Sequence, residues 1–221
     1  MNTSEARQFL LNNGLPEIAK KYNLNYRFDG RDLEQKETFA DMKIGSIIGL
    51  LLIYIILAWV FKSWTRPFSI MIMIPFAFIG AVLGHYLLGL TMSILSMFAL
   101  LALAGIVVNN SIILVSTIER RFDDLLSQND KDRQDDKVIN EAIIAGVVDR
   151  FRPVLLTSLT TIGGLSALLF EKSLQAQFLI PMAATIVFGL GITAFLVLVI
   201  VPSMMGISND FSNLVKNIRR R

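Results

Sequence analysis

The chain has 221 residues, of which 53% are hydrophobic and 18% are charged, and its formal net charge at pH 7 is +3. The distribution of charge excludes a soluble domain, because long stretches contain no Asp, Glu, Lys or Arg. The small net charge, without a basic stripe that alternates with aromatic residues, gives no indication of nucleic-acid binding. The charge-free stretches lie between Lys43 and Lys62, between Arg66 and Glu119, between Arg152 and Glu171, and between Lys172 and Asp210.

Residues 1–43 are polar and mixed in character. The sequence predicts a helix that Gly14 and Pro16 interrupt, and then a short strand at 24–28, where apolar residues alternate with polar ones. This segment is too short to bury a core of its own. We therefore interpret it as the α/β end of a larger domain.

The first three membrane-spanning helices are predicted at 44–62, 67–88 and 92–118. A helix needs about 20 apolar residues to cross a bilayer. The first charge-free stretch therefore fits one span, and the second, which is twice as long, fits two. A basic turn at 62–66 separates the first span from the second, and a turn around Gly89 separates the second from the third.

Residues 119–152 are a charged segment between the third and fourth spans. Apolar residues recur at helical spacing from Ile139 to Phe151, which predicts an amphipathic helix along the membrane surface. The fourth and fifth spans follow at 153–170 and 178–205, and 206–221 is a basic tail. The predicted fold class is an all-α polytopic membrane protein with five transmembrane helices and one surface helix.

The distribution of Lys and Arg predicts the orientation of these spans. Basic residues concentrate in the 62–66 turn, in 119–152 and in the tail, whereas the turns near Gly89 and at 171–177 carry only Lys172. Short loops with many basic residues stay in the cytosol, so the C-terminus is expected there and the N-terminus outside. Because no signal peptide or earlier helix would carry residues 1–43 across, we expect the chain to be the C-terminal part of a larger protein.

Small residues recur every four positions on two of the spans. Gly80 and Gly84 form a G-x-x-x-G pattern in the second span, and Thr185, Gly189 and Thr193 repeat in the fifth. Such stripes let helix backbones approach closely in a membrane. The pattern is common, and we interpret these five residues as helix-packing positions.

The fourth span carries a cluster of hydroxyl groups. Thr157, Thr160 and Thr161 fall on one face of a helix, and Arg150 lies two turns before Thr157 on the same face if the helix is continuous. These side chains could line a polar path. Alternatively, the threonines bond back to their own helix and Arg150 is a cytosolic anchor.

Two adjacent amides lie near the middle of the third span. Asn109 is ten residues before Glu119, about 15 Å of helix, so it lies near mid-bilayer. Neighbouring positions on a helix point about 100° apart, so Asn109 and Asn110 cannot serve one partner helix equally. Either amide could bond to a neighbouring helix, or line an ion or proton path.

No carboxylate lies within any of the five spans. A proton-coupled device normally needs a titratable group inside the membrane. His85, near the outer end of the second span, is the one candidate, and an amphipathic anchor is the simpler interpretation of it. The chain by itself therefore lacks a complete proton relay. We expect no cofactor, no metal and no enzymatic activity.

Several segments resemble one family of membrane transporters. "LAGIVVNNSIILVSTIERR", "EAIIAGVVDRFRPVLLTSLTTIGGLSALLF" and "PMAATIVFGLGITAFLVLVIVPSMM" resemble the last membrane spans of resistance-nodulation-division (RND) efflux permeases. The most specific piece is "RFRPVLLTSLTT", and "IPFAFIGAVLGHYLLG" resembles the span just before them. Residues 1–43 are similar to the last helix and strand of the family's periplasmic porter region. The resemblance covers nearly the whole chain.

The resemblance implies a set of relay residues. Such permeases have twelve spans in two pseudo-repeated halves, and this chain would match spans eight to twelve. Two aspartates in the fourth span of the family, which the present segment would not include, take up protons. Asn110, Arg150 and Thr157 match polar residues that complete the relay, and Thr160 and Thr161 would line it. Asn109 stands where the best-studied drug exporters have a lysine, and an amide cannot neutralise a carboxylate as an ammonium does.

The expected function is therefore the C-terminal part of a multidrug or solute efflux permease that is driven by the proton-motive force. Its expected place is the bacterial inner membrane, as a multi-pass protein. The implied partners are the N-terminal half with its aspartate pair, two further protomers of a homotrimer, a periplasmic adaptor, an outer-membrane channel and the lipid bilayer. The alternatives are a non-transporting assembly subunit, a truncated relic, or a lipid-exporting or translocation relative.

Overall fold

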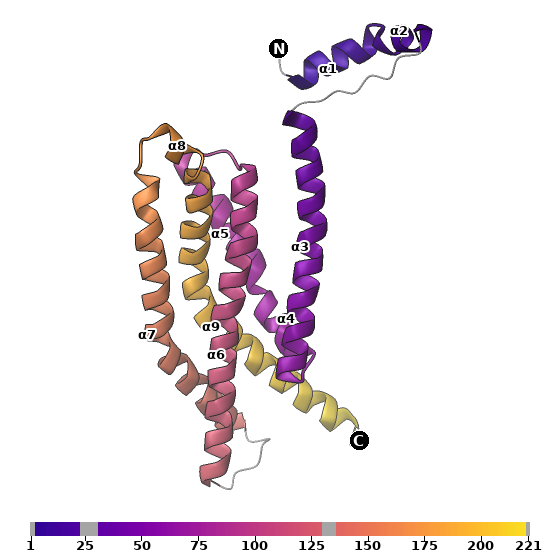
Figure 1. Ribbon diagram of the computed structural model, residues 1–221. Helices are drawn as coiled ribbons and strands as arrows, with labels where there is room; N and C mark the ends of the chain where they lie inside the picture. The colour runs from indigo at the N-terminus through magenta and orange to yellow at the C-terminus, as the bar shows by residue number, and fades with distance from the viewer. Residues whose placement is uncertain (1–2, 23–30, 130–135, 220–221) are drawn as a thin grey trace. The chain divides into compact units, whose positions relative to one another are not determined.

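The computed structural model describes residues 3–22, 31–129 and 136–219, and these residues are almost entirely helical (Figure 1). No strand occurs within the described residues. The chain divides into two compact units, Met1–Gly49 and Leu50–Arg221, and each is considered by itself. The predicted all-α fold is thus confirmed at this level.

The first unit contains two short helices and the beginning of a long one. α1 (Thr3–Asn12) and α2 (Leu15–Lys21) contact each other across a turn at Gly14. Gly14 has φ of 98°, a left-handed conformation that a residue without Cβ adopts at little cost. α3 (Arg31–Phe61) begins in this unit and ends in the second. The strand predicted at 24–28 lies outside the described residues.

The second unit is a bundle of long helices. Its helices after α3 are α4 (Thr65–Met71), α5 (Met73–Leu88), α6 (Ile94–Asn129), α7 (Asp136–Leu169), α8 (Leu174–Gln177) and α9 (Ile180–Arg219). α9 packs against α5, α6 and α7, and α6 also packs against α7 (Figure 1). Large apolar side chains from four of these helices fill the core, among them Ile70, Met73, Leu103, Leu114, Leu190 and Val197.

A proline interrupts one helix of the bundle, whereas another helix continues through its proline. Pro75 has no backbone N–H, so it cannot bond to the carbonyl of Met71, and the helix is interrupted between α4 and α5 at that carbonyl. α7 instead continues through Pro153. The segment predicted as a surface helix and the predicted fourth span therefore form one continuous helix.

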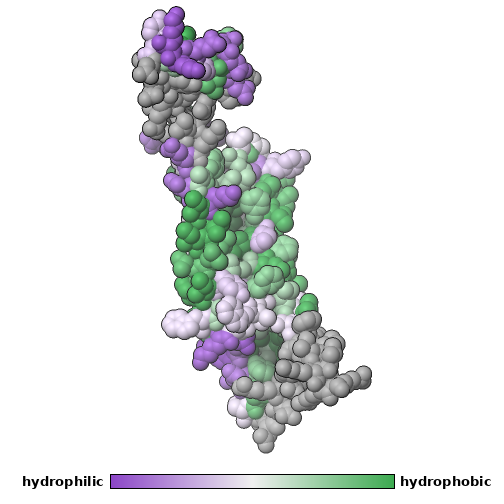
Figure 2. Space-filling model, turned by 90° about the vertical axis from the view of Figure 1, so that its right-hand side faces the viewer, coloured by the Kyte–Doolittle hydropathy of each residue, from purple (hydrophilic) through white to green (hydrophobic). Residues whose placement is uncertain are grey.

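Among the residues that the structure describes, four helical segments are long and apolar enough to cross a membrane: Glu37–Phe61, Thr65–Leu88, Ile94–Ser127 and Ile180–Ser208. Figure 2 shows hydrophobic side chains as a band over the helices of the second unit, with hydrophilic side chains below it. α7 is not among the four, and its second half carries hydroxyl groups and the pair Gly163 and Gly164, which lower its hydropathy. The predicted fourth span at 153–170, and with it the count of five, stays a prediction.

Candidate functional site

Arg150 joins α7 to α6. Its Nε donates a hydrogen bond to Oγ1 of Thr117 on α6, with an N–O distance of 2.6 Å. The Thr117 hydroxyl in turn donates to the carbonyl of Ile113, one turn earlier, at 2.8 Å. One turn beyond Thr117, Nε of Arg121 donates to Oδ2 of Asp149 at 2.6 Å. Two adjacent residues of α7 are thus both bound to α6.

The backbones of α6 and α7 approach closely beside these bonds. A Cβ added to Gly146 would lie 2.6 Å from Cγ1 and 2.9 Å from Cα of Ile118. Only glycine fits this contact without a shift of the helix, because the obstructing atoms include backbone. The crossing point therefore fixes the position of Arg150, which follows Gly146 by one turn.

The contact between Arg150 and Thr117 determines the levels at which the other polar residues of α6 and α7 lie along the bundle. Asn110 lies seven residues, or two helical turns, before Thr117, and Thr157 lies seven residues after Arg150. α6 and α7 are consecutive long helices that run in opposite directions (Figure 1). Asn110 and Thr157 therefore lie at about the same level of the bundle, further from the α6–α7 connection than Arg150.

The two asparagines differ in environment. Asn109 is exposed and Asn110 is half-buried. This difference agrees with neighbouring helical positions that point about 100° apart. Within the described part of the chain, neither amide has a hydrogen-bond partner. Each side chain thus offers two N–H donors and one carbonyl acceptor to a group outside these residues.

The threonines of α7 bond to their own helix. Thr157 donates to the carbonyls of Pro153 at 3.0 Å and Val154 at 3.1 Å. Thr160 donates to Leu156, and Thr161 to Thr157, both at 2.9 Å. Their hydroxyl oxygens still have accepting lone pairs. The threonine hydroxyls therefore donate to carbonyls of their own helix, and each can still accept a hydrogen bond from another group.

One face of α6 and α7 is uncovered. Asn109 and Gly105 are exposed on α6, and Thr157, Thr160 and Gly163 are exposed on α7. A Cβ added at Gly105 or Gly163 would meet no atom within 4 Å. These small and polar residues lie among exposed apolar side chains such as Ile113 on α6 and Leu156 and Leu159 on α7, whereas the exposed surfaces of α3 and α5 carry mainly large apolar side chains.

The small residues of α5 and α9 lie against one another. A Cβ on Gly80 would be 2.9 Å from the carbonyl oxygen of Phe188, and one on Gly84 would overlap the Phe188 side chain. A Cβ on Gly189 would be 3.0 Å from the carbonyl oxygen of Ala77. Thr185 and Thr193 are buried on α9, and their hydroxyls donate to the carbonyls of Pro181 and Gly189.

His85 is not an amphipathic anchor at the surface, because its side chain is only 3% exposed. Nδ1 lies 2.9 Å from the carbonyl oxygen of Ala81, and Nε2 lies 2.9 Å from Oγ of Ser96 at the start of α6. Ser93 and Ser96 exchange backbone N–H to hydroxyl bonds at 3.2 Å and cap this helix. His85 therefore ties the end of α5 to the start of α6.

Three residues of this region were not found by sequence reasoning. Thr117 binds Arg150, Gly146 forms the crossing point, and Ser158 is buried beside Thr157 with no hydrogen-bond partner for its hydroxyl in the described residues. Thr117 had a usable signal, since it lies two turns after Asn110 on the same helix face. Gly146 had a weak signal, since Ala142 precedes it by four residues, and no sequence signal distinguishes Ser158.

The arrangement can supply hydrogen-bond donors but no intramembrane acid. Asn109, Asn110 and Arg150 carry N–H donors suited to a carboxylate. At the α6–α7 crossing, the hydrogen bond from Arg121 lowers the pKa of Asp149 below its ordinary value. That carboxylate lies outside the predicted spans and remains ionised near neutral pH.

Comparisons with known proteins extend this description. A family model described as "AcrB/AcrD/AcrF family" matches residues 10–207. The swarming motility protein SwrC of Bacillus subtilis (strain 168) is 30% identical over 181 residues, which are 81% of this chain and 16% of SwrC. The multidrug resistance protein MdtC of Erwinia amylovora is 31% identical over 150 residues, 68% of this chain and 14% of MdtC.

Metal resistance proteins are also similar. The nickel and cobalt resistance protein CnrA of Cupriavidus metallidurans is 28% identical over 139 residues, 63% of this chain and 12% of CnrA. A crystal structure of a heavy metal efflux pump matches with a TM-score of 0.68 and 24% identity, over 91% of this chain and 19% of that chain. This last likeness concerns the fold alone. The chain spans 16% or less of the length of the three curated relatives.

Proposed function

The chain belongs to the AcrB/AcrD/AcrF family of RND permeases, whose model matches residues 10–207, and we propose that it supplies part of the intramembrane proton relay of an efflux permease. In this proposal the chain is the C-terminal membrane region of the permease, and the proton-motive force drives export. The relay residues are Asn109, Asn110, Arg150 and Thr157, with Thr160 and Thr161 beside them.

One observation carries the proposal: the bond between Arg150 and Thr117 joins α6 and α7 in a register that brings Asn110 and Thr157 to one level. Neither asparagine amide has a partner among the described residues. An unpartnered amide inside a bilayer is costly, so both amides require a polar group from elsewhere. The aspartate pair of the N-terminal half is a group of that kind.

The uncovered face of α6 and α7 supports an N-terminal partner half. Lipid-facing surfaces carry large apolar side chains, whereas small and polar residues mark helix contacts in membranes. Asn109 is exposed on this face, and a Cβ added at Gly105 or Gly163 would meet no atom within 4 Å. Helices that carry two carboxylates would cover it and accept hydrogen bonds from the asparagines. Such bonds to the charged form lower a carboxyl pKa, which desolvation would otherwise raise.

The proposal also covers the topology, the membrane and the assembly of the permease. The second half of α7 forms a fifth span, residues 1–43 end a periplasmic porter region, and 44–205 form the transmembrane domain. The N-terminus is periplasmic and the tail at 206–221 is cytosolic, in an inner membrane. The complete permease is a homotrimer that works with a periplasmic adaptor and an outer-membrane channel. Asn109 in place of a lysine leaves the carboxylate pair without an ammonium neighbour, so its coupling differs from that of drug exporters with the lysine.

The back-bonding threonines favour one alternative, a membrane subunit that does not transport. In such a protein the hydroxyls of Thr157, Thr160 and Thr161 would only satisfy their own helix. A relay role and a purely structural role predict different effects on export when a substitution keeps the shape of a side chain and removes its hydrogen bonding.

The test is export by the permease that contains this chain, measured as the efflux rate of a fluorescent substrate at equal protein abundance. Asn110→Leu and Thr157→Val should each lower export at least about tenfold, because a hydrogen bond to a charged group contributes about 1.5–3 kcal/mol. Asn109→Leu should have the same effect if this amide also donates to the aspartate pair.

The matched control is Thr185→Val, which removes a buried hydroxyl that bonds to its own helix on α9. This variant should export normally. Normal export by Asn110→Leu and Thr157→Val at normal abundance would remove the relay assignment and leave these side chains a role in helix packing alone.

A further inference from the structure

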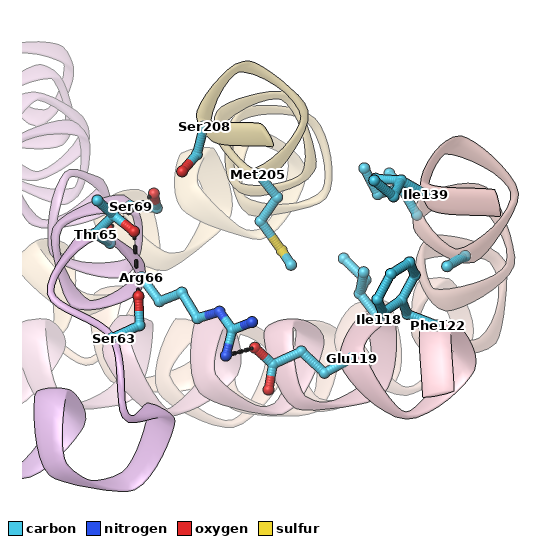
Figure 3. Close-up of a pocket in the computed structure, with 12 residues that line it drawn as sticks. Ser63, Thr65, Arg66, Ser69, Ile118, Glu119, Phe122, Ile139, Met205 and Ser208 are labelled. Atoms are coloured by element: carbon cyan, nitrogen blue, oxygen red, sulfur yellow. Dashed lines mark hydrogen bonds and ion pairs between the residues drawn. The ribbon is translucent and has the colours of Figure 1, made fainter. Parts of the chain in front are cut away.

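A cavity of about 320 Å³ lies at the end of the second unit near the α3–α4 turn (Figure 3). It is enclosed by that turn, by α6 near Glu119, by the beginning of α7 and by α9 near Met205. Its volume is at the lower end of the range for small-molecule sites, about 300–1,000 Å³. Polar groups from three of these elements line it, namely Ser63, Thr65, Arg66, Ser69, Glu119 and Ser208.

The lining is divided into a polar side and an apolar side. Figure 3 shows Ser63, Thr65 and Ser69 together on the side of the α3–α4 turn, and Ile118, Phe122 and Ile139 on the opposite side. Arg66 reaches from the polar side to Glu119, and Met205 points into the space between them. The cavity therefore suits a molecule with a polar part and an apolar part.

Arg66 presents an unused edge to this cavity. Its Nη1 donates to the carbonyl of Phe61 at 3.2 Å and forms an ion pair with Oε1 of Glu119 at 2.6 Å. Nε and Nη2 have no partner among the described residues. These two nitrogens form the side of the guanidinium that binds phosphate with two parallel hydrogen bonds. The neighbouring hydroxyls add further donors for phosphate oxygens.

Glu119 adds the opposite charge. Only its Oε1 is paired with Arg66, and the described residues provide no ion pair for Oε2. The formal charges of Arg66 and Glu119 cancel, so a purely anionic ligand would meet a repelling carboxylate. A ligand that contains both a phosphate and an ammonium group matches both side chains.

The position of the cavity, at the expected level of the lipid headgroups, favours a lipid as the ligand that carries these two groups. Trp59, near the end of α3, and Trp64, in the turn that follows it, are 81% and 77% exposed. Exposed tryptophans beside basic residues such as Lys62 are typical of the level of lipid headgroups. A soluble phosphate compound would use only the polar side, whereas a lipid would also cover Ile118, Phe122 and Ile139.

We infer that this cavity binds one zwitterionic phospholipid with a primary ammonium headgroup, as in phosphatidylethanolamine. The phosphate accepts hydrogen bonds from Nε and Nη2 of Arg66, and the ammonium donates to Glu119. The beginning of an acyl chain lies along Ile118, Phe122 and Met205. The bound lipid joins the α3–α4 turn to α6 and α9, independently of the proposed relay.

The inference is tested by native mass spectrometry of the purified chain in detergent, titrated separately with phosphatidylethanolamine and phosphatidylglycerol. One phosphatidylethanolamine should bind more tightly than any phosphatidylglycerol. Arg66→Lys keeps the charge and loses the planar pair of donors, so it should weaken this binding about tenfold. Arg121→Lys is the matched control, since Arg121 pairs with Asp149 outside the cavity, and it should bind as the unchanged chain does.

Glu119→Gln separates the two headgroup contacts. This variant keeps the size of the side chain and loses its charge, so it should abolish the preference for phosphatidylethanolamine over phosphatidylglycerol. Equal lipid binding by the unchanged chain, Arg66→Lys and Glu119→Gln would show non-specific lipid and overturn the inference. Displacement of the lipid by an equal concentration of soluble phosphoethanolamine would also overturn it, because the apolar side would then contribute nothing. Thermal unfolding of each variant confirms that the fold is retained.

Discussion

Asp149 and Arg150 are adjacent on α7, and each binds a different residue of α6. Arg150 donates to the hydroxyl of Thr117, and Asp149 accepts from Arg121, both at 2.6 Å. The sequence indicated Arg150 as a polar residue near the fourth span, but its partner Thr117 is 33 residues away, and no local pattern connects the two. At the residue scale, the contribution of a side chain depends on partners that sequence proximity does not reveal.

The pair between Arg121 and Asp149 predicts a pH dependence. The hydrogen bond from Arg121, the largest cause, lowers the pKa of Asp149 below its ordinary value of 3.8. A lowered carboxyl pKa stabilises the fold at pH values above the unfolded-state pKa, and this contribution is lost as the pH falls through the lowered value. Asp149→Asn should therefore lower the thermal unfolding temperature slightly and equally from pH 6 to 8, within the range for exposed ion pairs.

The difference between Asp149→Asn and the unchanged chain should disappear in acid, below the lowered pKa. Glu141→Gln, an exposed carboxylate on the same helix, is the control and should show no comparable effect at neutral pH. A difference that grows as the pH falls would mean that the pKa of Asp149 is raised by folding, not lowered. Differential scanning calorimetry in detergent across the pH range gives the measurement.

The helices approach each other most closely at glycines, because a residue without a side chain leaves room for the neighbouring backbone. Gly80, Gly84 and Gly189 lie at the contact of α5 with α9, and Gly146 lies at the contact of α6 with α7. The four-residue spacing indicated the first three as packing positions. Gly146 follows Ala142 by four residues, a spacing that the sequence analysis did not use, and the crossing of α6 and α7 shows what its missing Cβ permits. Gly163 and Gly164, which follow each other in the chain, have open space instead.

Gly146→Leu should separate α6 from α7. Its Cβ would lie 2.9 Å from Cα of Ile118, and backbone cannot move aside as a flexible side chain can. Overpacking of this kind costs about 1–3 kcal/mol. The variant should unfold at a lower temperature and lose the bond between Arg150 and Thr117.

Gly163→Ala is the matched control for this element. A Cβ there meets no atom within 4 Å, and alanine favours a helix over glycine by about 1 kcal/mol. The control should therefore be as stable as the unchanged chain, or more stable. Equal unfolding temperatures for Gly146→Leu and the unchanged chain would show that the helices do not pack in this register.

At the scale of the whole molecule, the distribution of Lys and Arg predicts the orientation in the membrane. The chain contains no cysteine, so single cysteines can be placed without background. With the N-terminus outside and the C-terminus in the cytosol, an impermeant thiol reagent added from the periplasmic side should label Asn12→Cys. It should not label Asn129→Cys or Asn217→Cys, because basic segments remain in the cytosol.

Permeabilised membranes provide the control for this topology, since all three cysteines should then react. Labelling at 129 or 217 in intact membranes would reject the orientation. Labelling at 12 together with 129 would specifically reject an odd number of spans between them.

The sequence by itself determined the helical character of the chain and most of its membrane-spanning segments. Charge-free runs of sufficient length and helix-breaking prolines are local properties, so they can be read without knowledge of the fold. The low hydropathy of the predicted fourth span also has a local cause, since α7 contains hydroxyl groups and glycines there. Residues 24–28, where a strand was predicted, lie outside the described part of the chain.

Only the tertiary structure decided which polar groups meet. The bonds of Arg150 to Thr117, of His85 to Ser96 and of Arg66 to Glu119 each join different helices. Their formation depends on the rotation and axial register of one helix against another, which depend on packing over the whole bundle. The same register leaves Asn109 exposed while Asn110 is half-buried. A helical period places two side chains on a face, but only the packed neighbour determines what that face contacts.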